Sequence, residues 1–100
     1  MEIRIDVDGT KAVVTPVGKL TVQTAPELDA AIEGLDANIM ELEINLSELD
    51  YISSAGLRVL VSTQKMMTTR GGTMTLVSPN DDVYEVFDMT GLAEVLTIVR

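Results

Sequence analysis

Residues 46–60, LSELDYISSAGLRVL, contain the change from strand-like to helix-like spacing around which the rest of the chain is arranged. Two adjacent serines, Ser53 and Ser54, lie where the helical spacing begins. The first N–H groups of a helix have no partner inside the helix and lie at the positive end of its dipole. A serine cap or a bound anion satisfies such groups. The pair therefore predicts a helix start that one serine caps and that can also hold a phosphoryl group.

Gly56 falls inside the first turn of this helix, where glycine costs about 1 kcal/mol relative to alanine. This cost indicates a close approach at that position, either by the sheet or by another protein. Neither serine has a visible base to activate it as a nucleophile, because Asp50 is three or four residues away and the chain has no His. A serine that takes part in chemistry here is therefore expected to receive a group.

The segment before this stretch alternates strictly. Apolar residues at positions 40, 42, 44 and 46 are separated by polar residues at 41, 43 and 45, which predicts a strand with one buried face. A parallel strand covered on both faces would be almost continuously apolar. We therefore expect helices packed on one face of the sheet, with the other face at least partly in water.

The remaining segments continue the change between the two periods. Residues 2–8 and 11–17 predict a hairpin around Asp8-Gly9, and Thr24-Ala25-Pro26-Glu27 has the pattern of a capping box that begins a helix. Further helices are expected after Ser53 and after residues 78–80, and further strands near residues 74–76 and 96–98. The order β-β-α-β-α-β-α-β predicts an α/β fold with a mixed sheet, because strands separated by helices pair in parallel.

The composition excludes several functions. The 100 residues include 7 Lys+Arg and 16 Asp+Glu, for a net charge of −9, and contain no Cys, His or Trp. This composition excludes disulfides, catalysis by a thiol or an imidazole, and metal sites with Cys or His ligands. The acidic residues are dispersed along the chain, which argues against nucleic acid as a partner. The length predicts one domain, residues 1–100. Because no signal peptide or long apolar run is visible, we expect a cytoplasmic protein that does not enter a membrane.

Other polar clusters do not predict a site. The pairs Asp6 with Asp8 and Asp81 with Asp82 lack the ligand number and spacing of a calcium loop, so we expect solvated surface, no metal and no cofactor. Arg58 lies one helical turn beyond Ser54, where it can contact a phosphate or a partner carboxylate. An ordinary surface cation is an equally good interpretation of Arg58.

The motif Ser47-x-Leu49-x-Tyr51-Ile52-Ser53-Ser54-Ala55-Gly56-Leu57 resembles the signature of STAS domains, specifically the stand-alone anti-sigma factor antagonists of bacteria. The length, the element order and Gly18-x-Leu20 before the first helix extend the resemblance over essentially the whole chain. The resemblance implies a single-domain STAS-like fold and a regulatory protein that is not an enzyme.

For this chain the resemblance implies a binding switch. The unmodified protein would bind an anti-sigma factor that is also a serine kinase of the histidine-kinase-like ATPase fold, and so release a sigma factor. Phosphorylation of Ser54 would end this interaction, and a PP2C-type phosphatase would restore it. Several family members have Asp where this chain has Ser53, which makes Ser53 the alternative acceptor. The partner-binding residues implied in this way are Ser53, Ser54, Ala55, Gly56, Leu57 and Arg58.

Two other functional classes remain open from the sequence. The domain can be a scaffold or subunit of a larger signalling assembly resembling the stressosome. It can also be a small nucleotide- or phosphate-binding module around the two serines, although the chain offers no general base for turnover.

Overall fold

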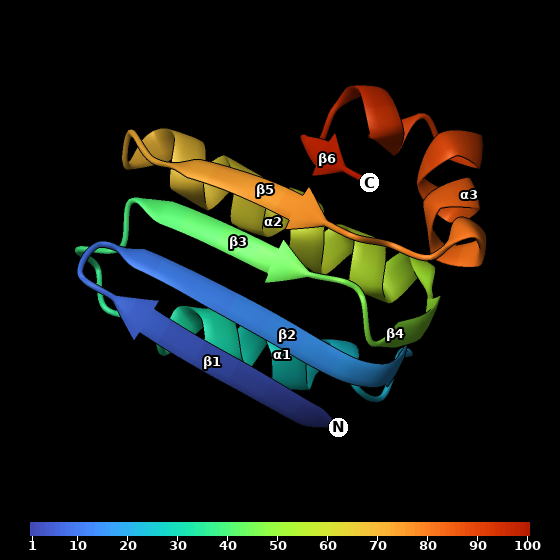
Figure 1. The fold of residues 1–100 in the computed structure, drawn as a ribbon, viewed down its shortest axis with the longest axis horizontal. Helices are drawn as coiled ribbons and strands as arrows, with labels where there is room; N and C mark the ends of the chain where they lie inside the picture. The colour runs from blue at the N-terminus through green and yellow to red at the C-terminus, as the bar shows by residue number, and fades with distance from the viewer.

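A computed structural model describes all 100 residues, Met1–Arg100. Its elements in chain order are β1 (Glu2–Asp8), β2 (Lys11–Leu20), α1 (Ala25–Glu33), β3 (Glu41–Asn45), β4 (Leu49–Ile52), α2 (Ser54–Thr69), β5 (Thr73–Val77), α3 (Asp81–Met89), the 3₁₀ turn η1 (Leu92–Glu94) and β6 (Ile98–Val99). The main sheet has the order β1-β2-β3-β5-β6, and β4 pairs with β2 off this path (Figure 1). The β1–β2 pair is antiparallel and all the other pairs are parallel, which confirms the predicted mixed sheet.

Strand β4 was not predicted, because no strand was expected between residue 46, the end of the predicted strand, and the helix start at Ser53. The first part of the ten-residue strand β2 (residues 11–14) pairs with β3 and its last part (residues 18–20) pairs with β4. The β2–β4 pairing shifts register between Gly18 and Lys19. Gly18 has a φ of 104°, a backbone conformation that side-chain-bearing residues rarely adopt. Both Asp50 and Tyr51 of β4 are exposed, so the strand carries no alternation that the sequence could have displayed.

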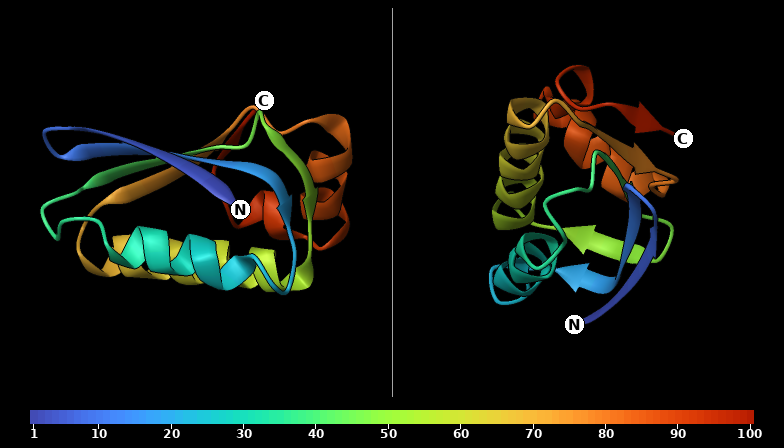
Figure 2. Two further views of the ribbon diagram at one scale, coloured as in Figure 1. Left: turned by 90° about the horizontal axis from the view of Figure 1, so that it is seen from below. Right: turned by 90° about the vertical axis from the view of Figure 1, so that its left-hand side faces the viewer.

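The helices cover one face of the sheet, as predicted. Helices α1 and α2 lie side by side beneath it, and α3 stands at the end of the molecule next to β4 (Figure 2). On the opposite face Lys11 forms ion pairs with Glu41 and Glu43, at 3.3 and 3.8 Å. The carboxylates of β3 therefore lie on a solvated sheet surface.

The core contains 20 buried apolar residues, and Phe87 is its only aromatic one. The expected burial of position 40 is wrong: Ile39 is 1% exposed whereas Met40 is 39% exposed. The physical reason is that β3 begins at Glu41, so the alternation of the strand does not extend back to Met40.

The capping box predicted at Thr24 is also wrong. The Thr24 hydroxyl donates to the Lys19 carbonyl at 2.8 Å and accepts from the Thr21 N–H at 2.7 Å, so it closes the β2–α1 loop and does not cap α1. Glu27 pairs with the N-terminal amine of Met1 at 2.6 Å, which holds the start of β1 against α1.

Candidate phosphorylation and partner-binding site

The two serines at the β4–α2 junction have different surroundings. Ser53 is the N-cap of α2, with an extended backbone (φ −94°, ψ 172°), and its hydroxyl oxygen accepts a hydrogen bond from the Gly56 N–H at 3.3 Å. Its own N–H donates to the Leu20 carbonyl at 2.9 Å, which ties the helix start to the end of β2. The half-buried Ser53 hydroxyl is therefore already used in the fold.

Ser54 is the first residue of α2, and its side chain is exposed. Its hydroxyl forms none of the side-chain hydrogen bonds in the structure, so it is free to react or to contact another molecule. The sequence placed both serines at the helix start, and only the backbone geometry distinguishes the cap from the free hydroxyl.

Gly56 is buried against the strand ends. A Cβ at this position would lie 2.7 Å from Cγ and Cδ2 of Leu20 and 2.9 Å from Cγ1 of Ile52, closer than real Cβ atoms approach other atoms. The close approach expected at Gly56 is therefore to the sheet. The glycine lets the first turn of α2 sit directly on β2 and β4.

The six predicted partner-binding residues do not all face solvent. Gly56 and Leu57 are buried, and Ala55 is half-buried against the core. Ser54 and Arg58 are exposed and lie on one helix face, four residues apart, and the Arg58 guanidinium forms no ion pair within the chain. Direct contact with a partner at this helix start is thus open mainly to Ser54 and Arg58.

The segment leading into β4 is tied to the edge strand. The Arg4 side chain donates to Glu48 at 2.9 Å and to Glu2 at 3.0 Å. These hydrogen bonds, the one to Glu48 foremost, raise the pKa of Arg4 above its ordinary value. Arg4 therefore anchors Glu48, one residue before β4, to the edge strand.

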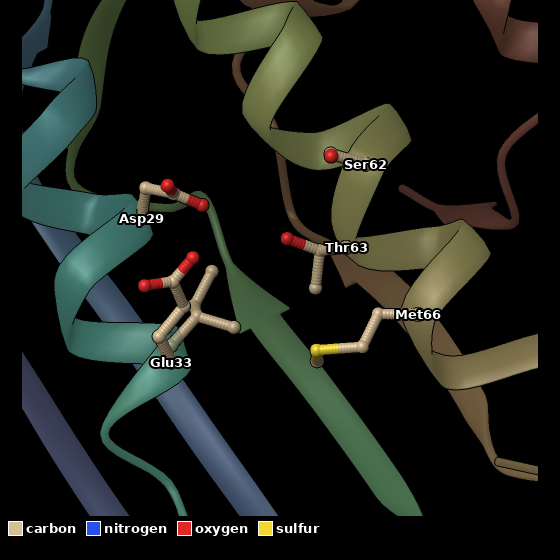
Figure 3. A pocket seen from close by; sticks show the side chains of 6 residues that line it. Asp29, Glu33, Ser62, Thr63 and Met66 are labelled. Carbon is tan, nitrogen blue, oxygen red and sulfur yellow. The ribbon is translucent and has the colours of Figure 1, made fainter. Parts of the chain in front are cut away.

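Two pockets lie on the surface beside these elements, and neither was predicted from the sequence. One, of about 190 Å³, lies between α1 and α2 (Figure 3), and its lining residues are Asp29, Ile32, Glu33, Ser62, Thr63 and Met66. Asp29 and Glu33 extend from α1 toward α2, where the Thr63 hydroxyl already donates to the Val59 carbonyl at 2.7 Å. No base–nucleophile pair is formed there.

The second pocket, of about 220 Å³, lies between β4 and α3, directly before the serine pair in the sequence. Its lining residues are Asp50, Tyr51, Ile52, Asp82, Val83 and Val86. No local pattern in the sequence predicts this pocket, because its two walls are about 30 residues apart and β4 itself was not predicted. None of the helices in the structure has both the length and the apolar character needed to cross a membrane.

Replacing Ser53 and Ser54 separately should distinguish their structural roles. Ser53→Ala removes the N-cap and is expected to lower the free energy of unfolding by about 1 kcal/mol, since a lost serine cap typically costs about 0.5–2 kcal/mol. Ser54→Ala removes no hydrogen bond and is expected to change it by less than about 0.5 kcal/mol. Urea denaturation followed by circular dichroism measures both. An equal loss for the two variants would contradict the assignment of the cap.

Comparison with known proteins identifies the group to which this domain belongs. The fold and the junction define a small α/β domain with a free hydroxyl at a helix start that rests on two strand ends. Residues 2–100 match the family model described as the STAS domain, and the chain belongs to this family.

The curated relatives include the anti-sigma-B factor antagonist of Bacillus subtilis (strain 168), which is 32% identical over 98% of this chain and 92% of its own length. Among solved structures, an anti-sigma factor antagonist from Mycobacterium paratuberculosis has a TM-score of 0.87 and 23% identity, over 98% of this chain and 84% of that one. The Bacillus cell fate determinant SpoIIAA in its phosphorylated form has a TM-score of 0.76 and 17% identity, over 99% and 92%. These structures confirm the predicted fold.

Proposed function

We propose that this protein is an anti-sigma factor antagonist, a binding module and not an enzyme, and that phosphorylation of Ser54 switches it off. The observation that carries the proposal is the difference between the two serines. Ser53 Oγ is engaged as the helix cap, whereas Ser54 Oγ is exposed and unbonded. A kinase needs an accessible hydroxyl, so Ser54 is the acceptor and Ser53 keeps the helix start in shape.

The position of Ser54 suits a phosphate that must not unfold the protein. A phosphoserine carries about −1.5 to −2 charges, which the positive end of a helix dipole tolerates. Arg58, one turn further along the same face, has no competing carboxylate within the chain and can approach the phosphate. The modification therefore leaves the fold intact and changes the charge of the partner surface.

The proposed partners are those that the resemblance to stand-alone anti-sigma factor antagonists implies. The unmodified protein binds an anti-sigma factor serine kinase of the histidine-kinase-like ATPase fold and thereby frees a sigma factor. A PP2C-type phosphatase removes the phosphate and restores binding. Residues 1–100 act as one domain. The exposed part of its binding surface at the helix start consists of Ser54 and Arg58. The protein acts in the cytoplasm, where a sigma factor works. The regulatory naming of the curated relatives supports this proposal.

Phosphate mapping tests the acceptor. The wild-type chain, Ser53→Ala and Ser54→Ala would each be incubated with the kinase and ATP and then analysed by mass spectrometry. We expect the wild type to receive one phosphate, at Ser54. Ser53→Ala should also be phosphorylated at Ser54, at no less than about a tenth of the wild-type rate, since that variant loses only a cap worth about 1 kcal/mol. Ser54→Ala should receive none. Phosphate at Ser53 in the wild type would overturn the assignment.

A further inference from the structure

The pocket between β4 and α3 has an acidic rim and an apolar floor. Ile52 and Val83, which are 3% and 1% exposed, form its base, and Val86 is half-buried beside them. Asp50 and Asp82 are exposed at its rim, and Tyr51, which is 49% exposed, adds an aromatic ring. At about 220 Å³ the pocket is smaller than the roughly 300–1,000 Å³ of small-molecule sites, so it has the size for a single side chain.

The backbone holds Asp50 out of the regular strand pairing. In the β2–β4 register Gly18 pairs with Leu49 and Lys19 pairs with Tyr51, so Asp50 has no partner residue on β2. An irregularity of this kind redirects a side chain and is frequent beside functional sites. The Asp50 carboxylate forms no ion pair within the chain, not even with Lys19 on the neighbouring strand.

The opposite wall is held firmly in place. The Asn80 side chain caps α3 by accepting from the Val83 N–H at 2.8 Å, and it donates to the Leu49 carbonyl of β4 at 3.2 Å. This contact fixes the first turn of α3 beside β4. In that turn Asp81 is paired with Arg100 at 2.6 Å, whereas Asp82 has no ion-pair partner. Two unpaired carboxylates therefore border one apolar pocket from two elements that are tied together.

We propose that this pocket receives an arginine side chain of the protein partner. An arginine has an aliphatic stem for the Ile52–Val83–Val86 floor, a planar cation for the Asp50 and Asp82 carboxylates, and a guanidinium face that can stack on Tyr51. Lysine lacks the planar group, and a purely apolar side chain would leave both carboxylates without a partner. The net charge of −9 also favours a partner with a basic surface.

The proposal deepens the proposed function and rests on it only for the identity of the partner. Residues 50–52 directly precede Ser53, so the β4 wall of the pocket leads straight into the helix start that carries the exposed Ser54. An arginine anchored beside Ser54 would place the partner where a phosphate there meets it. The pocket would hold the partner, and Ser54 would control it.

A side-chain probe tests the pocket without any kinase. The ¹⁵N-labelled full chain would be titrated with N-acetyl-arginine methylamide at millimolar concentrations, and in parallel with the lysine and norleucine analogues. We expect saturable shifts of the Tyr51, Ile52 and Val83 amides with the arginine probe, and shifts at least threefold smaller with the other two. The double variant Asp50→Asn/Asp82→Asn should lose the response. No saturable shift at these amides, or equal shifts with norleucine, would overturn the proposal.

A matched variant controls for charge alone. The double variant Asp29→Asn/Glu33→Gln also removes two negative charges, but from the pocket between α1 and α2. It should respond to the arginine probe as the wild type does. With the partner kinase, the Asp50/Asp82 double variant should bind at least tenfold more weakly and the Asp29/Glu33 variant within about twofold of wild type. Equal binding by the wild type and the Asp50/Asp82 variant would refute the docking role and leave the proposed function standing. A kinase that does not bind the wild type would refute the proposed function, and the probe titration would still decide the pocket.

Discussion

Phosphorylation of Ser54 is expected to weaken binding of the partner kinase at least about 100-fold, which corresponds to about 2.7 kcal/mol. The free hydroxyl lies on an exposed helix face, so a partner in contact with it would meet a new dianion. Repulsion from partner carboxylates or incomplete pairing after desolvation supplies a penalty of this size. Isothermal titration calorimetry with the phosphorylated and unmodified proteins measures it, and Ser54→Asp should reproduce part of the loss.

The controls separate the interface from the fold and from net charge. The circular dichroism spectrum and melting temperature of the phosphorylated protein should match those of the unmodified one within a few degrees, because the modification lies at the helix N-terminus, where the dipole favours anions. Ser62→Asp adds a negative charge to the same helix two turns away and should cost less than about threefold in affinity, because exposed charges at that separation are largely screened. A phosphorylated protein that binds with unchanged affinity, or an equal loss with Ser62→Asp, would contradict the switch at Ser54.

Replacement of Gly56 by valine is expected to lower the free energy of unfolding by about 3 kcal/mol, the upper part of the range for overpacked cores. A Cβ alone would lie 2.7 Å from Leu20, which is fully buried and has little room to move. The side chain would therefore push the first turn of α2 away from β2 and β4. For a domain of this length, such a loss lowers the melting temperature by more than about 10 °C.

Gly34→Ala is the matched control for this prediction. Gly34 ends α1, has an ordinary φ of −75°, and a Cβ there would lie 3.5 Å from its nearest neighbour, which is normal contact. Its free energy of unfolding should stay within about 0.5 kcal/mol of wild type. Thermal denaturation of both variants decides the matter: a Gly56→Val protein as stable as the Gly34→Ala protein would show that the close approach at α2 is not required.

The sequence alone predicted most of the elements because their patterns are local. The alternation in residues 40–46 predicted a strand with one wet face, which the structure has at residues 41–45, and the spacing after Ser53 predicted α2. Both follow from the directions in which consecutive side chains point, which are set within a few residues. Two predictions from local patterns were wrong. The Thr24 hydroxyl closes a loop where a capping box was expected, and Met40 lies before the strand begins.

The location of a candidate site was also visible in the sequence, since two serines before a helical segment mark a helix start. Tertiary structure alone decided which serine is free, because Ser53 becomes the cap only when its backbone is extended and bound to Leu20. It likewise decided that β4 is a strand and that Asp50 and Asp82 border one pocket. Strand pairing and pocket walls join residues far apart in the chain, and the energy of such contacts leaves no periodic trace in the local sequence.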